Sequence, residues 1–178
     1  MIVEPLGLRG AALLRGERHH DQRGHLRKVL VSEEARRHGL DVDVAEVVTT
    51  ANEVAGTIRG MHYQVAPAAE AKTLWVTNGA LRDVLVDLRP DEPTYGQWVG
   101  VDLAAGDDVA LHVPAGLAHG YQTLEDDTRL VYLISAGHSP GHARTLRWDD
   151  PTVGIDWPLA PTRISDKDRE GHLWPPTH

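Results

Sequence analysis

The 178-residue sequence contains no cysteine. The chain can therefore form no disulfide, no thiolate nucleophile and no cysteine-ligated zinc or iron–sulfur site. It also has no apolar run approaching the length that crosses a membrane, and its start, MIVEPLGLRG, lacks the basic and apolar stretches of a secretory signal. We therefore expect no membrane association and a cytoplasmic location.

Positive charge is scarce as well. The chain has 18 Lys and Arg residues against 26 Asp and Glu residues, a formal net charge of −8. This sign excludes nucleic acid as the main partner, so an anionic ligand requires a local basic cluster. The 41% hydrophobic content is sufficient for one packed core. We expect a single domain over residues 1–178.

Helical periodicity is rare, and short strand-like runs recur instead. One helix of at most two turns is predicted from Ser32, with Gly39 placed to end it. The strand-like runs are residues 26–31, 44–50, 72–77, 81–88, 98–103, 109–113, 129–135 and 145–148. Eight short strands predict an all-β fold, a cupin-type jelly-roll β-barrel with few short helices. From about residue 149 the chain is Pro-rich and irregular, and we expect residues 149–178 to fold back over the barrel.

Two local patterns predict more detail. Asn78-Gly79 lies between two strand-like runs and is the preferred pair for a two-residue hairpin, so residues 72–77 and 81–88 are expected to pair. Within the second run, Asp83 and Asp87 fall on the same face of the strand. That face is either a solvated side of a sheet or the lining of an open barrel.

Two histidine-containing segments stand beside predicted strands, RGMHYQ at residues 59–64 and PAGLAHG at residues 114–120. The second has the P-x-G-x-x-H spacing of metal-binding cupins, in which that histidine joins an earlier His-x-His pair and a glutamate. Here Gln64 replaces the second histidine of the pair, and an amide is a poor ligand for a transition metal. We expect no metal and no other cofactor. Taken alone, His62 and His119 are better explained as buried imidazoles that hold loops through hydrogen bonds.

A larger set of segments occurs in a characteristic order and spacing. They are DQRG at 21–24, IRGMHYQ at 58–64, Lys72, DVLVDLR at 83–89, PTYG at 93–96, the segment 114–120, Tyr132, DDP at 149–151 and ISDKD at 164–168. Together they resemble the dTDP-4-dehydrorhamnose 3,5-epimerase family, cupin-fold enzymes that act on nucleotide-linked 4-keto-6-deoxy sugars. The resemblance implies a cofactor-independent epimerase with a nucleotide-sugar substrate. It also implies a homodimer that exchanges N-terminal strands.

Epimerisation beside a ketone needs a base, a group that stabilises the enolate oxygen and a proton donor on the opposite face. His62 suits the base because an imidazole titrates near neutrality. By resemblance, Asp168 is the carboxylate that orients this imidazole and Lys72 is the ammonium beside the C4 oxygen. Tyr132, also by resemblance, returns the proton; without the resemblance it is an amphipathic core aromatic.

The remaining candidates concern binding. Arg23 and Arg59 are candidates for the pyrophosphate because guanidinium groups make bidentate contacts to phosphate oxygens. Alternatively they are surface salt-bridge residues. His119, Asp83 and Gln64 match family positions that line the barrel, and we assign them to substrate contact or support of such contacts rather than to the base.

Departures from the family pattern cluster around the nucleotide. Histidines surround the DQRG segment where the family has aromatics, and Val47-Val48-Thr49 replaces a usual Gln-x-Asn. Lost stacking on a base costs about 1 to 3 kcal/mol. His138, Trp75 and Trp98 are candidate replacements. The alternatives are therefore a 3-epimerase or keto-sugar isomerase on a different nucleotide sugar, or a cupin that binds a sugar or nucleotide without turnover.

Overall fold

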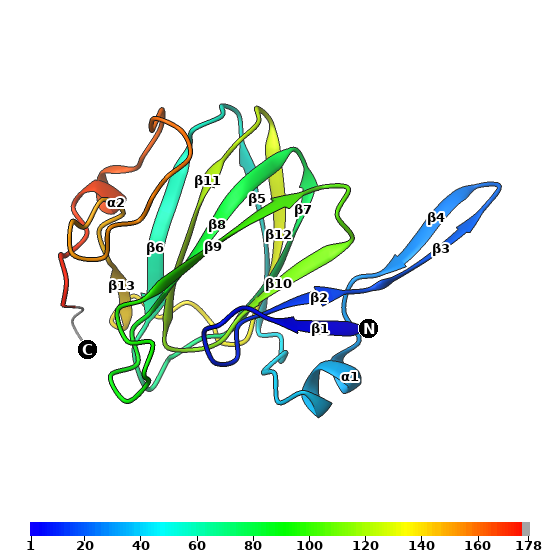
Figure 1. The fold of residues 1–178 in the computed structure, drawn as a ribbon, viewed down its shortest axis with the longest axis horizontal. Helices are drawn as coiled ribbons and strands as arrows, with labels where there is room; N and C mark the ends of the chain where they lie inside the picture. The colour runs from blue at the N-terminus through cyan, green and yellow to red at the C-terminus, as the bar shows by residue number, and fades with distance from the viewer. Residues whose placement is uncertain (176–178) are drawn as a thin grey trace.

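The computed structural model describes residues 1–175, which form an antiparallel two-sheet barrel with a projecting arm (Figure 1). The six-stranded sheet runs, in spatial order, β1 (Ile2–Pro5), β2 (Ala12–Arg15), β10 (Val109–Val113), β7 (Lys72–Asn78), β12 (Thr128–Ile134) and β5 (Glu46–Asn52). The five-stranded sheet runs β13 (Ala143–Thr145), β6 (Ile58–Gln64), β11 (Leu117–Thr123), β8 (Ala80–Asp87) and β9 (Trp98–Ala104). The arm is the hairpin β3 (Glu17–Asp21) and β4 (Gly24–Lys28), and the two short helices are α1 (Ser32–Arg37) and α2 (Asp166–Arg169). The predicted all-β class with few short helices is confirmed.

The main core lies between the two sheets. It combines alternate residues of strands from both, such as Leu74 and Leu130 from one sheet with Leu81 and Leu85 from the other. Because successive side chains of a strand point to opposite faces, one set of each strand fills the barrel. The interior of the barrel is therefore largely packed.

Each of the eight predicted strand-like runs overlaps an observed strand, although the last shares only Thr145 with β13. The predicted helix is also present as α1, and Gly39 follows it with a φ of 75°. Ser32 is the first helical residue rather than a cap, since the N-cap is Val31 and no side chain bonds there.

The predicted hairpin at Asn78-Gly79 is wrong. β7 pairs with β10 and β12, whereas β8 pairs with β9 and β11, so the chain passes from one sheet to the other at Gly79. Gly79 does take a positive φ of 73°, and an added Cβ would lie 2.4 Å from Oγ1 of Thr128. The dipeptide thus predicts a tight turn correctly, but both neighbours of β7 are strands from elsewhere in the chain.

The first histidine segment lies wholly in β6, and the second forms a turn at residues 114–116 and then enters β11. β6 and β11 pair in the middle of the five-stranded sheet, with His62 opposite His119 and a register shift between His119 and Tyr121. Their backbones approach closely at glycine, since a Cβ on Gly60 would lie 2.5 Å from Cα of Gly120. Close backbone approach explains why glycines that signal turns in the sequence lie inside these strands.

Both faces of β8 are buried. Asp83 and Asp87 do share the face that points into the barrel, while Val84 and Val86 form a second apolar cluster on the other face. Residues of the tail, including Val153 and the partly buried Ile155, Trp157 and Trp174, belong to this second cluster. The solvated-face alternative is therefore excluded, and the tail covers this side of the sheet.

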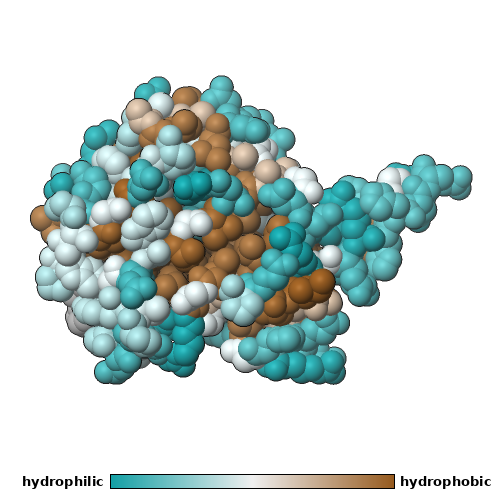
Figure 2. Space-filling model, viewed as in Figure 1, coloured by the Kyte–Doolittle hydropathy of each residue, from teal (hydrophilic) through white to brown (hydrophobic). Residues whose placement is uncertain are grey.

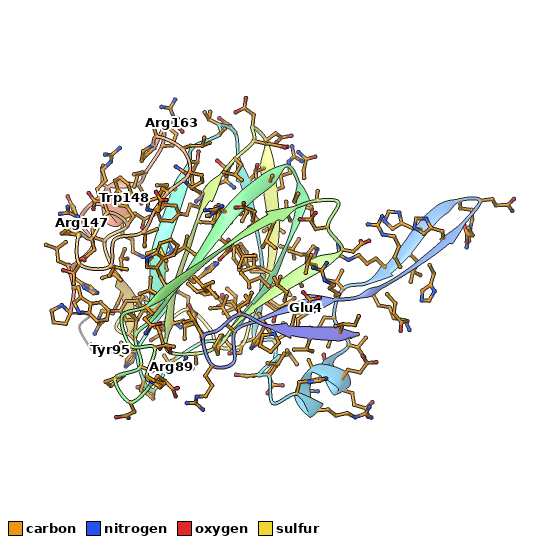
Figure 3. The ribbon with its side chains drawn as sticks, in the orientation of Figure 1. Glu4, Arg89, Tyr95, Arg147, Trp148 and Arg163 are labelled. Carbon is orange, nitrogen blue, oxygen red and sulfur yellow. The ribbon has the colours of Figure 1, made fainter. Side chains whose placement is uncertain are left out.

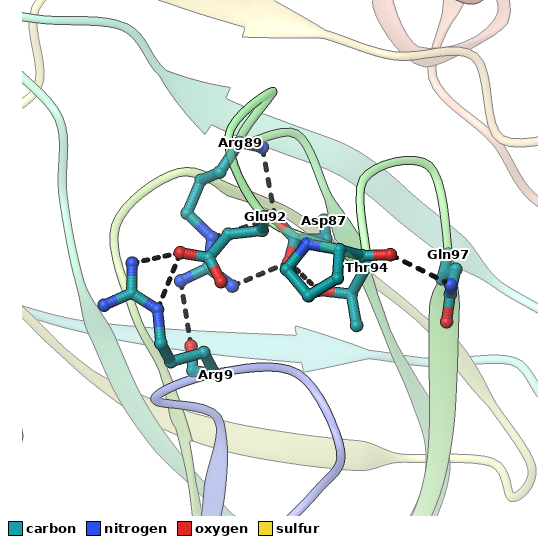
Figure 4. A network of polar contacts seen from close by, with 7 residues as sticks. Arg9, Asp87, Arg89, Glu92, Thr94 and Gln97 are labelled. Carbon is teal, nitrogen blue, oxygen red and sulfur yellow. Dashed lines mark hydrogen bonds and ion pairs between the residues drawn. The ribbon is translucent and has the colours of Figure 1, made fainter.

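Asp87, the last residue of β8, anchors the loop that leads to β9. Its carboxylate accepts hydrogen bonds from Arg89 (2.8 and 2.7 Å) and from Oγ1 of Thr94 (2.6 Å), within a network that also contains the Arg9–Glu92 pair (Figure 4). Burial alone would raise the pKa of Asp87, but these hydrogen bonds hold it below its ordinary value. Asp87 is thus a fully satisfied structural carboxylate.

Candidate active site

His62 and Asp168 form a hydrogen-bonded dyad although 106 residues separate them in the sequence. Nε2 of His62, on β6, lies 2.6 Å from Oδ1 of Asp168, on α2 of the tail. The Asp168 side chain is 4% exposed and that of His62 is 38% exposed. The histidine of the dyad is therefore accessible to a ligand, whereas its carboxylate is buried beneath the imidazole.

Backbone groups hold the buried carboxylate in place. The Gly60 N–H donates to Oδ2 of Asp168 over 3.2 Å, and Ser165 caps α2 by accepting from the Asp168 N–H over 3.2 Å. Burial raises the pKa of Asp168, but the hydrogen bond and charge of His62 outweigh it and lower the pKa below its ordinary value. Asp168 is therefore ionised at neutral pH and fixes which imidazole nitrogen is free.

A cavity of about 220 Å³ lies in front of the dyad, between the sheets. Its lining brings together five of the predicted site residues, Arg59, His62, Lys72, His119 and Tyr132, with Val48, Thr50, Tyr121 and Ile134. His62 comes from β6 of one sheet, and Lys72 and Tyr132 come from β7 and β12 of the facing sheet. A ligand in this cavity would have the imidazole on one side and the phenol on the other.

His119, which lines this cavity, and Asp83, which does not, form a second histidine–carboxylate pair, with side chains 6% and 0% exposed. Nε2 of His119 lies 3.0 Å from Oδ2 of Asp83, and the His119 ring meets the Tyr132 ring edge-on at 6.0 Å between centroids. Oδ1 of Asp83 has no hydrogen-bond partner among the described residues. Burial raises the pKa of Asp83, and this is only partly opposed by His119 and Lys72.

Tyr132 is held as a neutral phenol. Burial raises its pKa well above 10, and the neighbouring Tyr121 and Asp83 add to that effect. The hydroxyl therefore keeps its proton at neutral pH until a strongly basic atom appears next to it. This is the property required of a proton donor.

Lys72 has a partner that the sequence did not single out. Its Nζ lies 2.9 Å from Oε1 of Glu70, and the two side chains are 10% and 11% exposed. Glu70 in turn accepts from Nε2 of Gln64 over 2.9 Å. The Gln64 amide also donates to the carbonyls of Ala68 and Gly137 and accepts from the Ser139 N–H. Gln64 thus contacts loops of the protein with both amide atoms.

A cationic region adjoins the dyad. A second cavity of about 400 Å³ is lined by Arg59, Arg163 and Lys167, together with His62 and Asp168. Nε of Arg59 donates to the Asn52 amide oxygen over 2.7 Å. Within residues 1–175, no salt bridge involves any of these three cations. Three uncompensated charges at one cavity form the local basic cluster that the net charge of −8 requires.

Arg163 and Lys167 were missed by sequence reasoning because the tail showed no regular pattern. The tail is nevertheless fixed there: the Ile58 N–H donates to the Arg163 carbonyl over 2.9 Å, beside a parallel bridge between Thr57 and Arg163. Figure 3 labels Arg163 at the outer end of this segment. The available signal was the position of the two residues, since Arg163 directly precedes the family-like ISDKD segment and Lys167 lies within it.

Three predicted binding residues, Arg23, Gln64 and Asp83, do not line the cavity of about 220 Å³; Asp83 bonds to a lining residue and Gln64 to the partner of a lining residue, whereas Arg23 does neither. It lies in the turn of the arm, its side chain is 85% exposed, and it pairs with Asp21 over 2.6 Å. Of the three candidates for base stacking, His138 lines a cavity that also contains His62 and Lys72. Trp75 and Trp98 pack instead against apolar clusters on the outer faces of the sheets.

No group of three or more His, Asp or Glu side chains in residues 1–175 is arranged to hold a metal ion. In the same range, no helix is long and apolar enough to cross a membrane.

Comparison with known proteins gives consistent matches. A family model described as dTDP-4-dehydrorhamnose 3,5-epimerase matches residues 5–175. The dTDP-4-dehydrorhamnose 3,5-epimerase of Sinorhizobium fredii is 39% identical over 169 residues, 94% of this chain and 87% of the relative. The enzyme of that name from Bacillus anthracis, solved with TDP and PPi bound, aligns with a TM-score of 0.92 and 35% identity over 97% of this chain and 98% of its own. ChmJ of Streptomyces bikiniensis, a 3'-monoepimerase solved with dTDP-quinovose, aligns with a TM-score of 0.88 and 34% identity over 96% and 86%.

Fold, site and matches define the class of this protein: a cupin-type jelly-roll isomerase, an epimerase that acts on sugars. Within that class, the chain belongs to the dTDP-4-dehydrorhamnose 3,5-epimerase family, as the sequence motifs predicted.

Proposed function

We propose that this enzyme inverts C3 and C5 of a nucleotide-linked 4-keto-6-deoxyhexose, a dTDP-4-dehydro-6-deoxyglucose-like sugar, without a metal or other cofactor. The observation that carries the proposal is the pairing across one cavity of a carboxylate-supported histidine from β6 with a buried tyrosine from β12. Inversion requires a proton to leave from one face of the carbon and to return to the other. Groups on facing sheets meet that requirement.

His62 acts as the base. Its Nε2 faces Asp168, so Nδ1 is the nitrogen that takes the hydrogen from the carbon next to the ketone. The electron pair of the C–H bond moves toward the C4 oxygen and forms an enolate. Asp168 stabilises the resulting imidazolium, since a carboxylate held at 2.6 Å favours positive charge on the ring.

Lys72 stabilises the enolate, and Tyr132 completes the inversion. The ammonium lies in the same cavity as His62, where positive charge lowers the energy of the developing oxyanion. Tyr132 then donates its phenolic proton to the carbon from the opposite face. The phenolate regains a proton from solvent, and His62 releases one to solvent, so each turnover leaves the enzyme unchanged.

The diphosphate of the substrate fits the cationic cavity. Arg59 lines both this cavity and the sugar cavity, which makes it the contact between the two parts of the substrate. Arg163 and Lys167 supply further unpaired charge on the tail side. Guanidinium and ammonium groups of this kind hold phosphate oxygens through charge-assisted hydrogen bonds. His119 lines the sugar cavity against the Tyr132 ring and is held by Asp83, so this pair positions Tyr132 and the sugar hydroxyls.

Arg23 fits the proposal in a homodimer. The arm projects from the barrel, and its hydrophobic Leu26 is 61% exposed. Figure 2 shows hydrophobic residues gathered over β9, β10 and β2 next to the arm, where β1 and β9 are unpaired sheet edges. Exposed edges and apolar surface are usually covered by a partner. We place the arm on a second copy, with Arg23 at its diphosphate, and the enzyme in the cytoplasm.

Nuclear magnetic resonance in deuterated water tests this function. Incubation with dTDP-4-dehydro-6-deoxyglucose, after exhaustive chelation of metals, is expected to exchange deuterium into both C3 and C5. Exchange at C3 alone would make the enzyme a 3-epimerase, a real alternative because the chain is 34% identical to one. No exchange at either carbon would indicate a binding protein and overturn the proposal, and recovery only with an added divalent ion would overturn the metal-free mechanism.

A further inference from the structure

We propose that Glu70 is a positioning residue of the reaction, whose carboxylate aims the Lys72 ammonium at the sugar. This inference rests on the proposed function, in which Lys72 faces the C4 oxygen. Glu70 precedes β7 by two residues and comes from the loop after β6, whereas Lys72 is the first residue of β7. The contact between Nζ and Oε1 is 2.9 Å.

The Glu70 carboxylate is itself held on both sides. One oxygen accepts from Lys72 and the other accepts from Gln64, whose amide is anchored by three loop backbone groups at 2.6 to 3.3 Å. The position of the ammonium is thus transmitted from fixed backbone through two side chains. A lysine has a long, flexible stem, and such a chain of contacts orders it before the substrate binds.

Stability does not account for this pair. Both side chains are about nine-tenths buried, and at such sites the cost of removing two ions from water largely cancels their attraction. The pair also lines a cavity that contains His138 and shares His62 and Lys72 with the sugar cavity. A nearly buried ion pair at the edge of a reaction cavity is better explained by what it orients.

Without Glu70, another acceptor would compete for the ammonium. Oδ1 of Asp83 is buried without a partner, and the charge of Lys72 already acts on that carboxylate. A Lys72 side chain released from Glu70 would turn toward Asp83, away from the C4 oxygen. Displacement of a catalytic group by about 1 Å can cost on the order of 100-fold in rate.

The test compares two glutamates of matched burial. Glu70→Gln keeps the shape and removes the charge, and Glu92→Gln does the same in the loop between β8 and β9, where Glu92 is 13% exposed and pairs with Arg9 rather than with a residue of the sugar cavity. We expect Glu70→Gln to lower kcat and the rate of C3 and C5 deuterium exchange by about 10- to 100-fold. KM and the affinity for dTDP should change by less than about threefold, because Lys72 acts on the enolate rather than the bound ground state. Glu92→Gln should leave all four quantities near wild type.

A double-mutant cycle shows whether Glu70 acts through Lys72. In a Lys72→Met background, Glu70→Gln should cause almost no additional loss of exchange, whereas a general structural defect would lower it again. If Glu70→Gln does not melt cooperatively, Glu70→Asp, with a shorter reach, replaces it in the cycle. An active wild type with Glu70→Gln equal to Glu92→Gln would overturn this inference alone. A wild type that exchanges neither hydrogen would overturn the proposed function instead.

Discussion

At the scale of single residues, burial distributes the acid and base roles between side chains that sequence alone leaves ambiguous. His62 is half exposed over an ionised carboxylate, while Tyr132 is enclosed and keeps its proton. His119 also lines the cavity and pairs with a carboxylate, but its side chain is only 6% exposed, against 38% for His62. The imidazole with access to a ligand is therefore His62.

We expect His62 and Asp168 to act as one unit. His62→Ala and Asp168→Ala should each lower the exchange rate by about 10²- to 10⁴-fold, and the double variant should be little worse than His62→Ala. The reason is that Asp168 does not line the sugar cavity and acts there through the imidazole it orients. Steady-state rates of the three variants provide the measurement; strictly multiplicative losses would show that Asp168 acts independently.

His112 gives a prediction about pH and stability. It is 1% exposed, bonded to Oγ1 of Thr73 over 3.0 Å, and burial lowers its pKa to about 4, with only weak opposition from Asp41. Because the unfolded state binds a proton near pH 6.5 and the folded state does not, stability falls as the pH drops from about 6.5 toward 4. Between pH 8 and pH 5 this group should cost about 2 kcal/mol.

Urea unfolding at both pH values measures this effect. The control is His112→Asn, which removes the titrating ring and offers a neutral acceptor or donor to Thr73. The wild type should lose about 2 kcal/mol more stability than this variant between pH 8 and pH 5. Equal losses in the two proteins would show that His112 does not titrate as its burial implies.

At the scale of elements, close contact between β6 and β11 positions the dyad. Gly60 donates to Asp168, and its Cα lies against Gly120 of the neighbouring strand. Gly60→Ala should therefore destabilise the fold by about 3 kcal/mol or more, because its φ of 131° disfavours a side chain and the new Cβ would lie 2.5 Å from Cα of Gly120.

Gly106→Ala is the matched control for that substitution. A Cβ at Gly106 meets nothing within 4 Å, and its φ lies outside the left-handed region. Its melting temperature should stay near that of the wild type, while Gly60→Ala should melt several degrees lower. A Gly60→Ala variant as stable as Gly106→Ala would mean that β6 can move away from β11.

The strand-like runs predicted β7 and β12, which carry Lys72 and Tyr132, but not β6 and β11, which carry His62 and His119. β8 and β10 are rich in apolar residues that favour strands, whereas β6 and β11 contain Gly60 and Gly120, and glycine in a sequence suggests a turn. The Asn78-Gly79 turn also exists, but a dipeptide cannot specify which distant strands flank β7. Glu70 and Arg163 could not be identified because their contacts depend on loop geometry that has no sequence period.

At the scale of the whole molecule, the arm holds Arg23 away from the sugar cavity of the same chain. We expect a homodimer of twice the 19.5 kDa chain mass in sedimentation at micromolar concentration. Arg23→Ala should raise KM by about tenfold, because one charge-assisted hydrogen bond to the diphosphate is lost. A monomer that is fully active would contradict the arrangement.

Mixing a variant with weakened substrate binding and an inactive variant tests whether the arm serves the partner. Subunit exchange between Arg23→Ala and His62→Ala should restore about a quarter of the wild-type activity at low substrate, since a mixed dimer holds one intact site. This site combines His62 from one chain with Arg23 from the other. Activity no greater than the average of the two parents would place Arg23 at its own cavity or outside the reaction.

The opposed placement of His62 and Tyr132 is the central claim, and one time course tests it most directly. Tyr132→Phe keeps the base and Lys72 but removes the donor, so nuclear magnetic resonance in deuterated water should show continued exchange of the first hydrogen while the inverted product falls at least tenfold. The wild type, followed in parallel, should show exchange and inversion rising together. If Tyr132→Phe loses exchange and inversion to the same extent, or if His62→Ala retains near-normal exchange, the assignment of base and acid is wrong.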